Sequence, residues 1–130
     1  MIVVDASVIV ELLLRSDAGE ASRRRLVQRR EKLHAPHILD LEVANALRRC
    51  ILRGEIDNRR GGEALADLIG IPIERHGHQP LLERVWQLRH NLTAYDAAYL
   101  ALAERLDAPL LTRDSGLASV GGHRARVELA

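Results

Sequence analysis

Short apolar segments alternate with longer stretches of helical spacing along the whole chain. Ile2 to Val4 form the first such segment, and further strands are expected at 33–35, 71–74, 109–112 and 126–128. Between them, apolar residues three or four positions apart predict helices at 8–14, 17–30, 37–53, 58–68, 80–90 and 93–106. Alternating short strands and longer helices predict an α/β domain with a mostly parallel sheet.

Capping and turn residues give these elements their expected boundaries. Ser7 can cap the first helix, Asp17 the second and Thr93 the helix that runs to about Leu106. Pro36 suits the first turn of the third helix. His76 is expected in a turn after the third strand, and Trp86 is expected to be a core residue or a dimer contact.

Length and composition narrow the class of protein. A chain of 130 residues is the size of one domain, expected to span 1–130, and its one cysteine makes a disulfide framework impossible. The N-terminal segment carries Asp5 and Glu11 within its apolar stretch, so we expect it to be part of the fold and no signal peptide. The longest wholly apolar run, at 97–103, is far too short to span a membrane. These features indicate a soluble protein of a reducing cytoplasm.

The positive charge is unevenly distributed, although the net charge is only +1. A basic run at 23–32 contains Lys32, the sole lysine, and the candidate RNA-binding residues Arg23, Arg24, Arg25, Arg29 and Arg30. Such a run can meet phosphates or can be an ordinary solvated helix face, and the sequence leaves both open. Aromatic residues make up 2% of the chain, which argues against a base-stacking platform.

Four carboxylates stand at the ends of apolar segments. Asp5 closes the first strand, Glu42 lies near the start of the third helix, Asp96 lies in the first turn of a helix that is apolar almost all round, and Asp114 follows the last-but-one strand. Singly, the aspartates can be helix caps or capping-box residues and Glu42 part of a polar helix face. Strand ends and helix starts of a parallel sheet meet at one edge, so together the four are expected to converge.

Convergence of four carboxylates requires a counter-charge. Two of them about 4 Å apart repel by about 4 kcal/mol at an effective dielectric of about 20, so cations or bound protons are needed. An all-oxygen ligand set favours Mg²⁺ or Mn²⁺, and the six histidines show no zinc-type spacing.

Metal-assisted hydrolysis of a phosphodiester fits such a site, because a metal-activated water replaces a protein nucleophile. Phosphoryl transfer through an aspartyl phosphate would also place aspartates at strand ends. It would need a lysine beside the phosphoryl group, and Lys32 lies away from the expected site edge. Hydrolysis is therefore favoured.

At these residues the chain resembles the PIN-domain ribonucleases, specifically the VapC-type toxins of bacterial toxin–antitoxin pairs. The matching pieces are IVVDAS at 2–7, LDLEVANAL at 39–47, LTAYDAAYLALA at 92–103 and APLLTRDSGLA at 108–118. The resemblance implies an α/β/α sandwich with strand order 3-2-1-4-5 and an endoribonuclease that uses Mg²⁺ or Mn²⁺. It also implies a homodimer and a cognate VapB-type antitoxin that covers the site.

Carried over by position, the resemblance assigns the acidic site to Asp5, Glu42, Asp96 and Asp114, with Ser7, Asn45 and Thr112 as polar supports. Some relatives have one more acidic residue just after Asp114, where this chain has Ser115 and Gly116, so the number of metal ions stays open. The alternative function is a degenerate PIN domain that binds RNA or protein without cutting. Which RNA is cut is not encoded in any visible motif.

Overall fold

Five parallel strands form one sheet in the computed structural model, which describes all 130 residues. The strands are β1 (Ile2–Val4), β2 (Leu33–Pro36), β3 (Ile73–His76), β4 (Leu110–Thr112) and β5 (Val127–Leu129). Every neighbouring pair is parallel, and the order is β3-β2-β1-β4-β5. The predicted parallel sheet and its strand order are confirmed.

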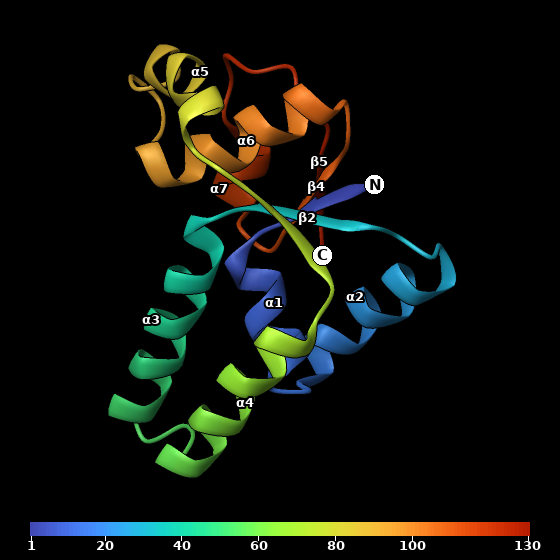
Figure 1. The fold of residues 1–130 in the computed structure, drawn as a ribbon, viewed down its shortest axis with the longest axis vertical. Helices are drawn as coiled ribbons and strands as arrows, with labels where there is room; N and C mark the ends of the chain where they lie inside the picture. Colours follow the sequence, from blue (N-terminus) through green and yellow to red (C-terminus); the bar gives the residue numbers. More distant parts are fainter.

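Helices cover both faces of this sheet. One face carries α1 (Ala6–Leu13), α2 (Asp17–Gln28), α3 (Ile38–Leu52) and α4 (Asn58–Gly70), which lie together below the sheet in Figure 1. The other carries the 3₁₀ helix η1 (Gln79–Leu81), α5 (Leu82–Gln87) and α6 (Ala94–Leu106). The short α7 (Ser115–Ser119) connects β4 to β5. The predicted α/β/α sandwich is confirmed.

The order of the strands creates a crevice beside β1. The chain moves outward from β1 to β2 and β3, then returns to add β4 on the other side of β1. The connections that leave β1 and β4 therefore diverge to opposite faces. In parallel sheets ligands bind beyond the carboxyl ends of strands at this reversal, so the residues that follow β1 and β4 mark where a site belongs.

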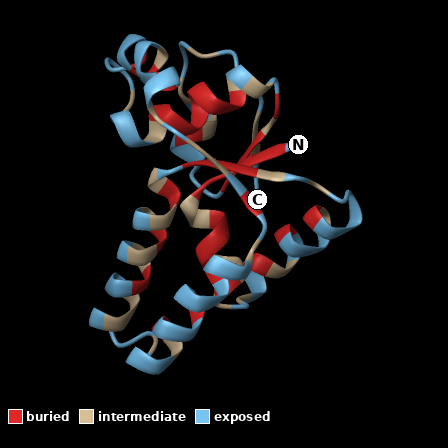
Figure 2. Cartoon of the chain, viewed as in Figure 1, coloured by how far each residue is buried: buried red, intermediate tan, exposed pale blue.

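The core is densest around β1, α1 and α6 (Figure 2). Val3, Ile9, Leu100 and Leu110 are each fully shielded from solvent. Every residue of α6 from Ala97 to Ala103 is buried, because this helix packs against β1, β2 and β4 while α5 covers its outer side. A helix so deeply placed fixes its N-terminal turn against the sheet, and that turn carries Asp96.

Two element boundaries differ from the sequence prediction at β2 and β3. Pro36 is the last residue of β2 and not the first turn of α3. Its missing N–H costs nothing there, since β1 pairs with β2 only as far as His34. His76 is the last residue of β3 and not part of a turn, because pairing begins at Ile73, after Pro72, and extends to the hydrogen bond from the His37 N–H to the His76 carbonyl (2.9 Å).

Other differences arise at helix ends and at the surface. Ser16, not Asp17, caps α2, through the Gly19 N–H (3.0 Å). The expected helix at 80–90 is divided into η1 and a short α5, and Trp86 on α5 is 67% exposed with the Arg89 guanidinium 4.6 Å from its ring centre. Trp86 is therefore not a core residue, and its role as a dimer contact stays a prediction. No helix of the structure combines the length and the apolar character that a membrane crossing requires.

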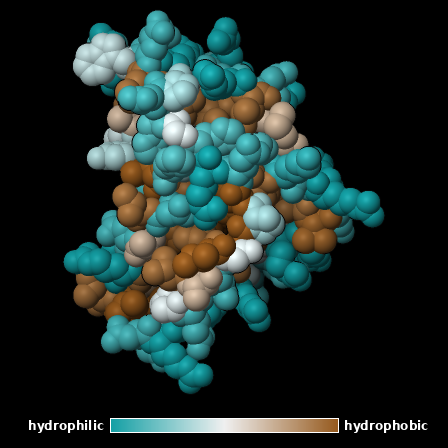
Figure 3. All heavy atoms as spheres, in the orientation of Figure 1, coloured by the Kyte–Doolittle hydropathy of each residue, from teal (hydrophilic) through white to brown (hydrophobic).

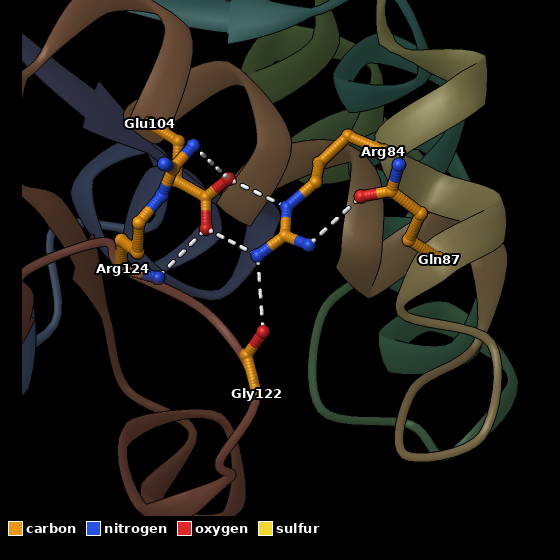
Figure 4. A network of polar contacts seen from close by, with 5 residues as sticks. All are labelled: Arg84, Gln87, Glu104, Gly122 and Arg124. Carbon is orange, nitrogen blue, oxygen red and sulfur yellow. Dashed lines mark hydrogen bonds and ion pairs between the residues drawn. The ribbon is translucent and has the colours of Figure 1, made fainter.

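A buried glutamate anchors the irregular segment that leads into β5 (Figure 4). Glu104, near the end of α6, accepts two hydrogen bonds from the Arg84 guanidinium (2.8 and 3.0 Å) and one from the Arg124 N–H (2.7 Å). Arg84 also donates to the Gly122 carbonyl (3.0 Å). The bond from Arg84 holds the pKa of Glu104 below its usual range, so the anchor is charged at neutral pH.

Candidate active site

Asp5 is fixed at the carboxyl end of β1 by both neighbouring elements. Its N–H donates to the Leu111 carbonyl of β4 (3.3 Å), which continues the sheet by one residue. Its Oδ1 accepts from the Ser7 hydroxyl (2.6 Å) and from the Val8 N–H (3.3 Å), so Asp5, not Ser7, is the N-cap of α1. Its Oδ2 accepts from the hydroxyl of Thr112, the last residue of β4. Both carboxylate oxygens are thereby oriented.

Burial makes this carboxylate unusual. Asp5 is 8% exposed and Thr112 is fully buried. Loss of hydration raises the pKa of Asp5, and the hydrogen bonds from Ser7 and Thr112 oppose that rise only in part. A cap alone does not require a buried charge, because serine or asparagine would serve.

Asp114 is joined to Asp5 through the same hydroxyl. The Thr112 Oγ accepts from the Asp114 N–H (3.0 Å) while it donates to Asp5. The Ser7 Oγ likewise accepts from the Arg113 N–H (3.0 Å), which holds the segment after β4 against the start of α1. Asp114 caps α7 through one oxygen, Oδ1, which accepts from Gly116 and Leu117 (2.8 and 3.3 Å). Its second oxygen has no hydrogen bond within the protein.

Asp96 lies in the first turn of α6, where its carboxylate has no ion-pair partner. Thr93 is the N-cap and accepts from the Asp96 backbone N–H (3.2 Å), as predicted. The Asp96 side chain makes no return bond to the Thr93 amide, so only half of the expected capping box is present. Burial raises the pKa of Asp96 most, and the charges of Asp114 and Asp5 raise it further.

Glu42, on the second turn of α3, faces the same cluster. The buried Tyr99 hydroxyl on α6 donates to its Oε1 (2.7 Å). Burial raises the pKa of Glu42, and the charges of Asp96 and Asp5 add to the rise despite that hydrogen bond. Asn45, one turn later, is exposed and forms no hydrogen bond with any of the four carboxylates. The structure thus separates Glu42 from the polar helix face to which its own sequence pattern assigns it.

These four carboxylates form a concentration of negative charge without a protein counter-ion. None of them takes part in an ion pair, although ion pairs are common elsewhere in the protein. The nearest arginine in sequence, Arg113, is paired with Glu11 (2.7 Å). The possible metal ligands are all oxygen atoms, and the charges of neighbouring carboxylates contribute to the raised pKa values of Glu42 and Asp96. The set therefore fits a hard divalent cation.

The predicted RNA-binding arginines lie on α2 and the turn that follows it. Arg25 is turned inward to an ion pair with Glu128 of β5. Arg23 and Arg24 are exposed and share Glu20 as a partner (3.2 and 3.8 Å). Arg29 and Arg30 are exposed and take part in no ion pair. All but Arg25 are therefore available to a partner.

Two residues that position the site were not singled out in the sequence. Tyr99 supports Glu42 from a different helix, and the only sequence signal is a hydroxyl in the otherwise apolar stretch of α6, one turn after Asp96. His78 accepts a hydrogen bond from the Ile38 N–H (3.0 Å) and so satisfies a free donor at the start of α3, the helix that carries Glu42.

Known proteins resemble this chain over nearly its whole length. Residues 2–123 match the PIN domain family. Ribonuclease VapC12 of Mycobacterium tuberculosis is 43% identical over 129 residues, which cover 99% of this chain and 98% of that protein. The crystal structure of PAE2754 from Pyrobaculum aerophilum superposes with a TM-score of 0.73 at 26% identity and covers 97% of this chain and 81% of that one.

A further solved structure has the same fold at lower sequence identity. VapBC2 from Rickettsia felis, bound to a DNA fragment from its promoter, superposes with a TM-score of 0.69 at 12% identity and covers 99% of this chain and 98% of that one. The resemblance inferred from the sequence motifs is confirmed by these matches. The chain belongs to the PIN-domain family and, within it, to the VapC ribonucleases.

Proposed function

We propose that this VapC-family endoribonuclease cleaves RNA phosphodiester bonds at the four-carboxylate site with Mg²⁺ or Mn²⁺ as cofactor. Asp5, Asp96 and Asp114 hold the cation, and Glu42 completes the site directly or through water. The observation that carries the proposal is the unpaired negative charge at the strand reversal. Three of the four carboxyl groups have raised pKa values, and the charges of the cluster contribute to two of these rises.

The chemistry of the donors supports the choice of cofactor. Carboxylate oxygens suit Mg²⁺ and Mn²⁺, whereas no histidine or cysteine takes part in this cluster. A divalent cation, when bound, lowers the pKa of a water near the phosphate and offsets the charge that develops during phosphodiester hydrolysis.

The protein's own contribution is to hold the acidic groups in place. Ser7 and Thr112 fix both oxygens of Asp5, and Thr112 also holds the backbone of Asp114. Tyr99 fixes Glu42. Because these donors are rigid and largely buried, the carboxylates need little reorganisation to receive a cation or a substrate phosphate.

RNA binding is proposed to depend on phosphate contacts. Arg23, Arg24, Arg29 and Arg30 supply exposed positive charge on and after α2. Phosphate contacts carry no base preference by themselves, so these residues contribute affinity and not choice of target. An RNA substrate implies that the enzyme acts in the cytoplasm.

A VapB-type antitoxin and a second copy of the chain are the proposed protein partners. A chain of the same fold occurs in a toxin–antitoxin complex from Klebsiella pneumoniae. Here apolar side chains gather on the surface of α3 and α4 (Figure 3), including Leu52 and Ile69, which are 68% and 81% exposed. A different apolar surface supports a homodimer: Trp86 is exposed on α5, beside a hollow of about 170 Å³ lined by Leu82, Tyr95 and others.

RNA cleavage by the purified protein tests the proposal. Cleavage is expected with Mg²⁺ or Mn²⁺, and EDTA should abolish it reversibly. Asp5→Asn and Asp96→Asn should each lower the rate by about 100-fold or more, since each removes a charged ligand of the cation that the reaction needs. Asp67→Asn is the matched control, because Asp67 is an exposed aspartate of α4 without an ion pair, and it should cleave like the parent.

Equal cleavage by the parent and both site variants would identify a contaminating nuclease and contradict the proposal. Tight RNA binding without cleavage by the parent, in either metal, would instead indicate the degenerate binding module.

A further inference from the structure

Three metal-ligating side chains converge at the edge of the sheet, away from the four carboxylates. His34 of β2 and Glu74 of β3 are paired in register on neighbouring strands. His76 lies two residues after Glu74, so its side chain projects from the same face of β3. A ligand atom from each of the three lies within 4.8 Å of the other two, and no other set of three histidine, cysteine or acidic side chains in the protein is so compact.

Two of the three distances within this group suit one small cation. The His34 Nδ1 lies 2.9 Å from the His76 Nε2 and 3.6 Å from the Glu74 Oε2. Bonds of about 2.0–2.1 Å to a shared Zn²⁺ place tetrahedral ligands about 3.3 Å apart. To bind the ion, the His34 Nδ1 and the His76 Nε2 must therefore separate by a few tenths of an ångström, and the His34 Nδ1 and the Glu74 Oε2 must approach by about as much. Side-chain rotations alone can make both adjustments.

The burial of this group and the access to it favour metal binding as well. His34 is buried, so little water competes for its ring nitrogen, and a neutral imidazole offers a lone pair to a metal ion. Glu74 is largely exposed, with a side chain 70% accessible. A surface hollow of about 400 Å³ beside His34 and Glu74 opens a path for an ion. Two imidazoles and a carboxylate are the ligand set of zinc and other late transition metals, unlike the all-oxygen set at the carboxyl edge.

We propose that His34, Glu74 and His76 form a second metal site, selective for Zn²⁺-type transition metals, that links the edge strand β3 to β2. The fourth position is open to water on the exposed side of Glu74. The affinity is moderate, because the buried Nε2 of His34 has no hydrogen-bond partner and so lacks the acceptor that usually strengthens a ligating histidine. The site is independent of the proposed nuclease function.

Metal binding to the full-length, untagged protein tests this site. Zn²⁺ is titrated calorimetrically and Co²⁺ by its visible absorption, both in excess Mg²⁺ so that the carboxylate cluster is saturated with its own cation. The variants are Glu74→Gln and His76→Gln, and the control is His90→Gln, because His90 is exposed and outside the group. Circular dichroism without metal shows whether each variant is folded. If His76→Gln does not fold, Glu74→Gln still tests the site, because Glu74 is exposed.

The parent and His90→Gln should bind one Zn²⁺ per chain, show the absorption of four-coordinate Co²⁺ and melt at a higher temperature with Zn²⁺. Each of Glu74→Gln and His76→Gln should weaken binding by at least about tenfold and lose the absorption. Absence of saturable one-to-one binding in the parent would overturn the proposal, and so would parent-like binding by both variants. Either result would mean that His34 and His76 are joined by a hydrogen bond and do not bind a metal ion.

Discussion

Removing one charge from the carboxylate cluster should stabilise the metal-free protein. Asp96→Asn preserves the size of the side chain, and the cap from Thr93 uses the backbone N–H, which the substitution retains. The pKa of Asp96 is raised by burial and then by Asp114 and Asp5. A carboxyl group whose pKa is higher in the folded than in the unfolded protein stabilises the fold while protonated, and that stabilisation is lost as the pH rises through the folded pKa. At neutral pH the ionised Asp96 therefore costs stability.

The magnitude follows from Coulomb's law. Two carboxylates about 4 Å apart repel by about 4 kcal/mol at an effective dielectric of about 20, and the repulsion falls in proportion as their separation grows. Asp96 is only half-buried, so water and salt screen part of this repulsion. We expect Asp96→Asn to raise the free energy of unfolding by about 1 kcal/mol, which raises the melting temperature by about 3–5 °C for a domain of this size.

Thermal unfolding in EDTA at low salt measures this effect. Asp67→Asn serves again as the surface control and should leave the melting temperature unchanged. The difference between the parent and Asp96→Asn should shrink as the pH falls and disappear below about pH 3, where the carboxyl group is protonated in both the folded and unfolded states. A melting temperature several degrees below that of the parent in EDTA would refute the reasoning and make Asp96 a structural residue.

Three further substitutions test the supports and the basic surface. Tyr99→Phe removes the donor to Glu42 and should weaken Mn²⁺ binding about tenfold, measured by calorimetry, with a folded protein retained. Thr112→Val leaves a buried carboxylate oxygen and an N–H without their partner and should lower the free energy of unfolding in urea by about 1–3 kcal/mol. Replacing Arg23 and Arg24 with glutamine should flatten the log–log salt dependence of RNA affinity by about 0.7–0.9 for each phosphate that is no longer neutralised. An unchanged slope would show a solvated helix face.

The parallel sheet and the meeting of two acidic strand ends could be predicted from local patterns, whereas the strand order was implied only by the family resemblance. A short apolar strand that ends in Asp5, and another that ends just before Asp114, are visible in the chain, and the geometry of parallel sheets brings such ends together. Thr93 was predicted as the cap of α6 from the same kind of local signal and is confirmed.

Glu42 could not be separated from a surface residue by its own helix pattern. Its partner Tyr99 lies on α6, more than fifty residues away along the chain, and comes into contact only when the folded sheet brings the two helices to the same edge. His76 was placed in a turn for a similar reason. Its strand conformation depends on pairing with β2, which no local propensity contains.

Anomalous diffraction from crystals grown with Mn²⁺ tests the central claim most directly, because it locates the cation independently of activity. The account predicts one or more manganese peaks bounded by carboxylate oxygens of Asp5, Asp96 and Asp114, in protein from a preparation that cleaves RNA with Mn²⁺. Active protein whose manganese lies elsewhere, with these carboxylates free of metal at saturating Mn²⁺, would contradict the account.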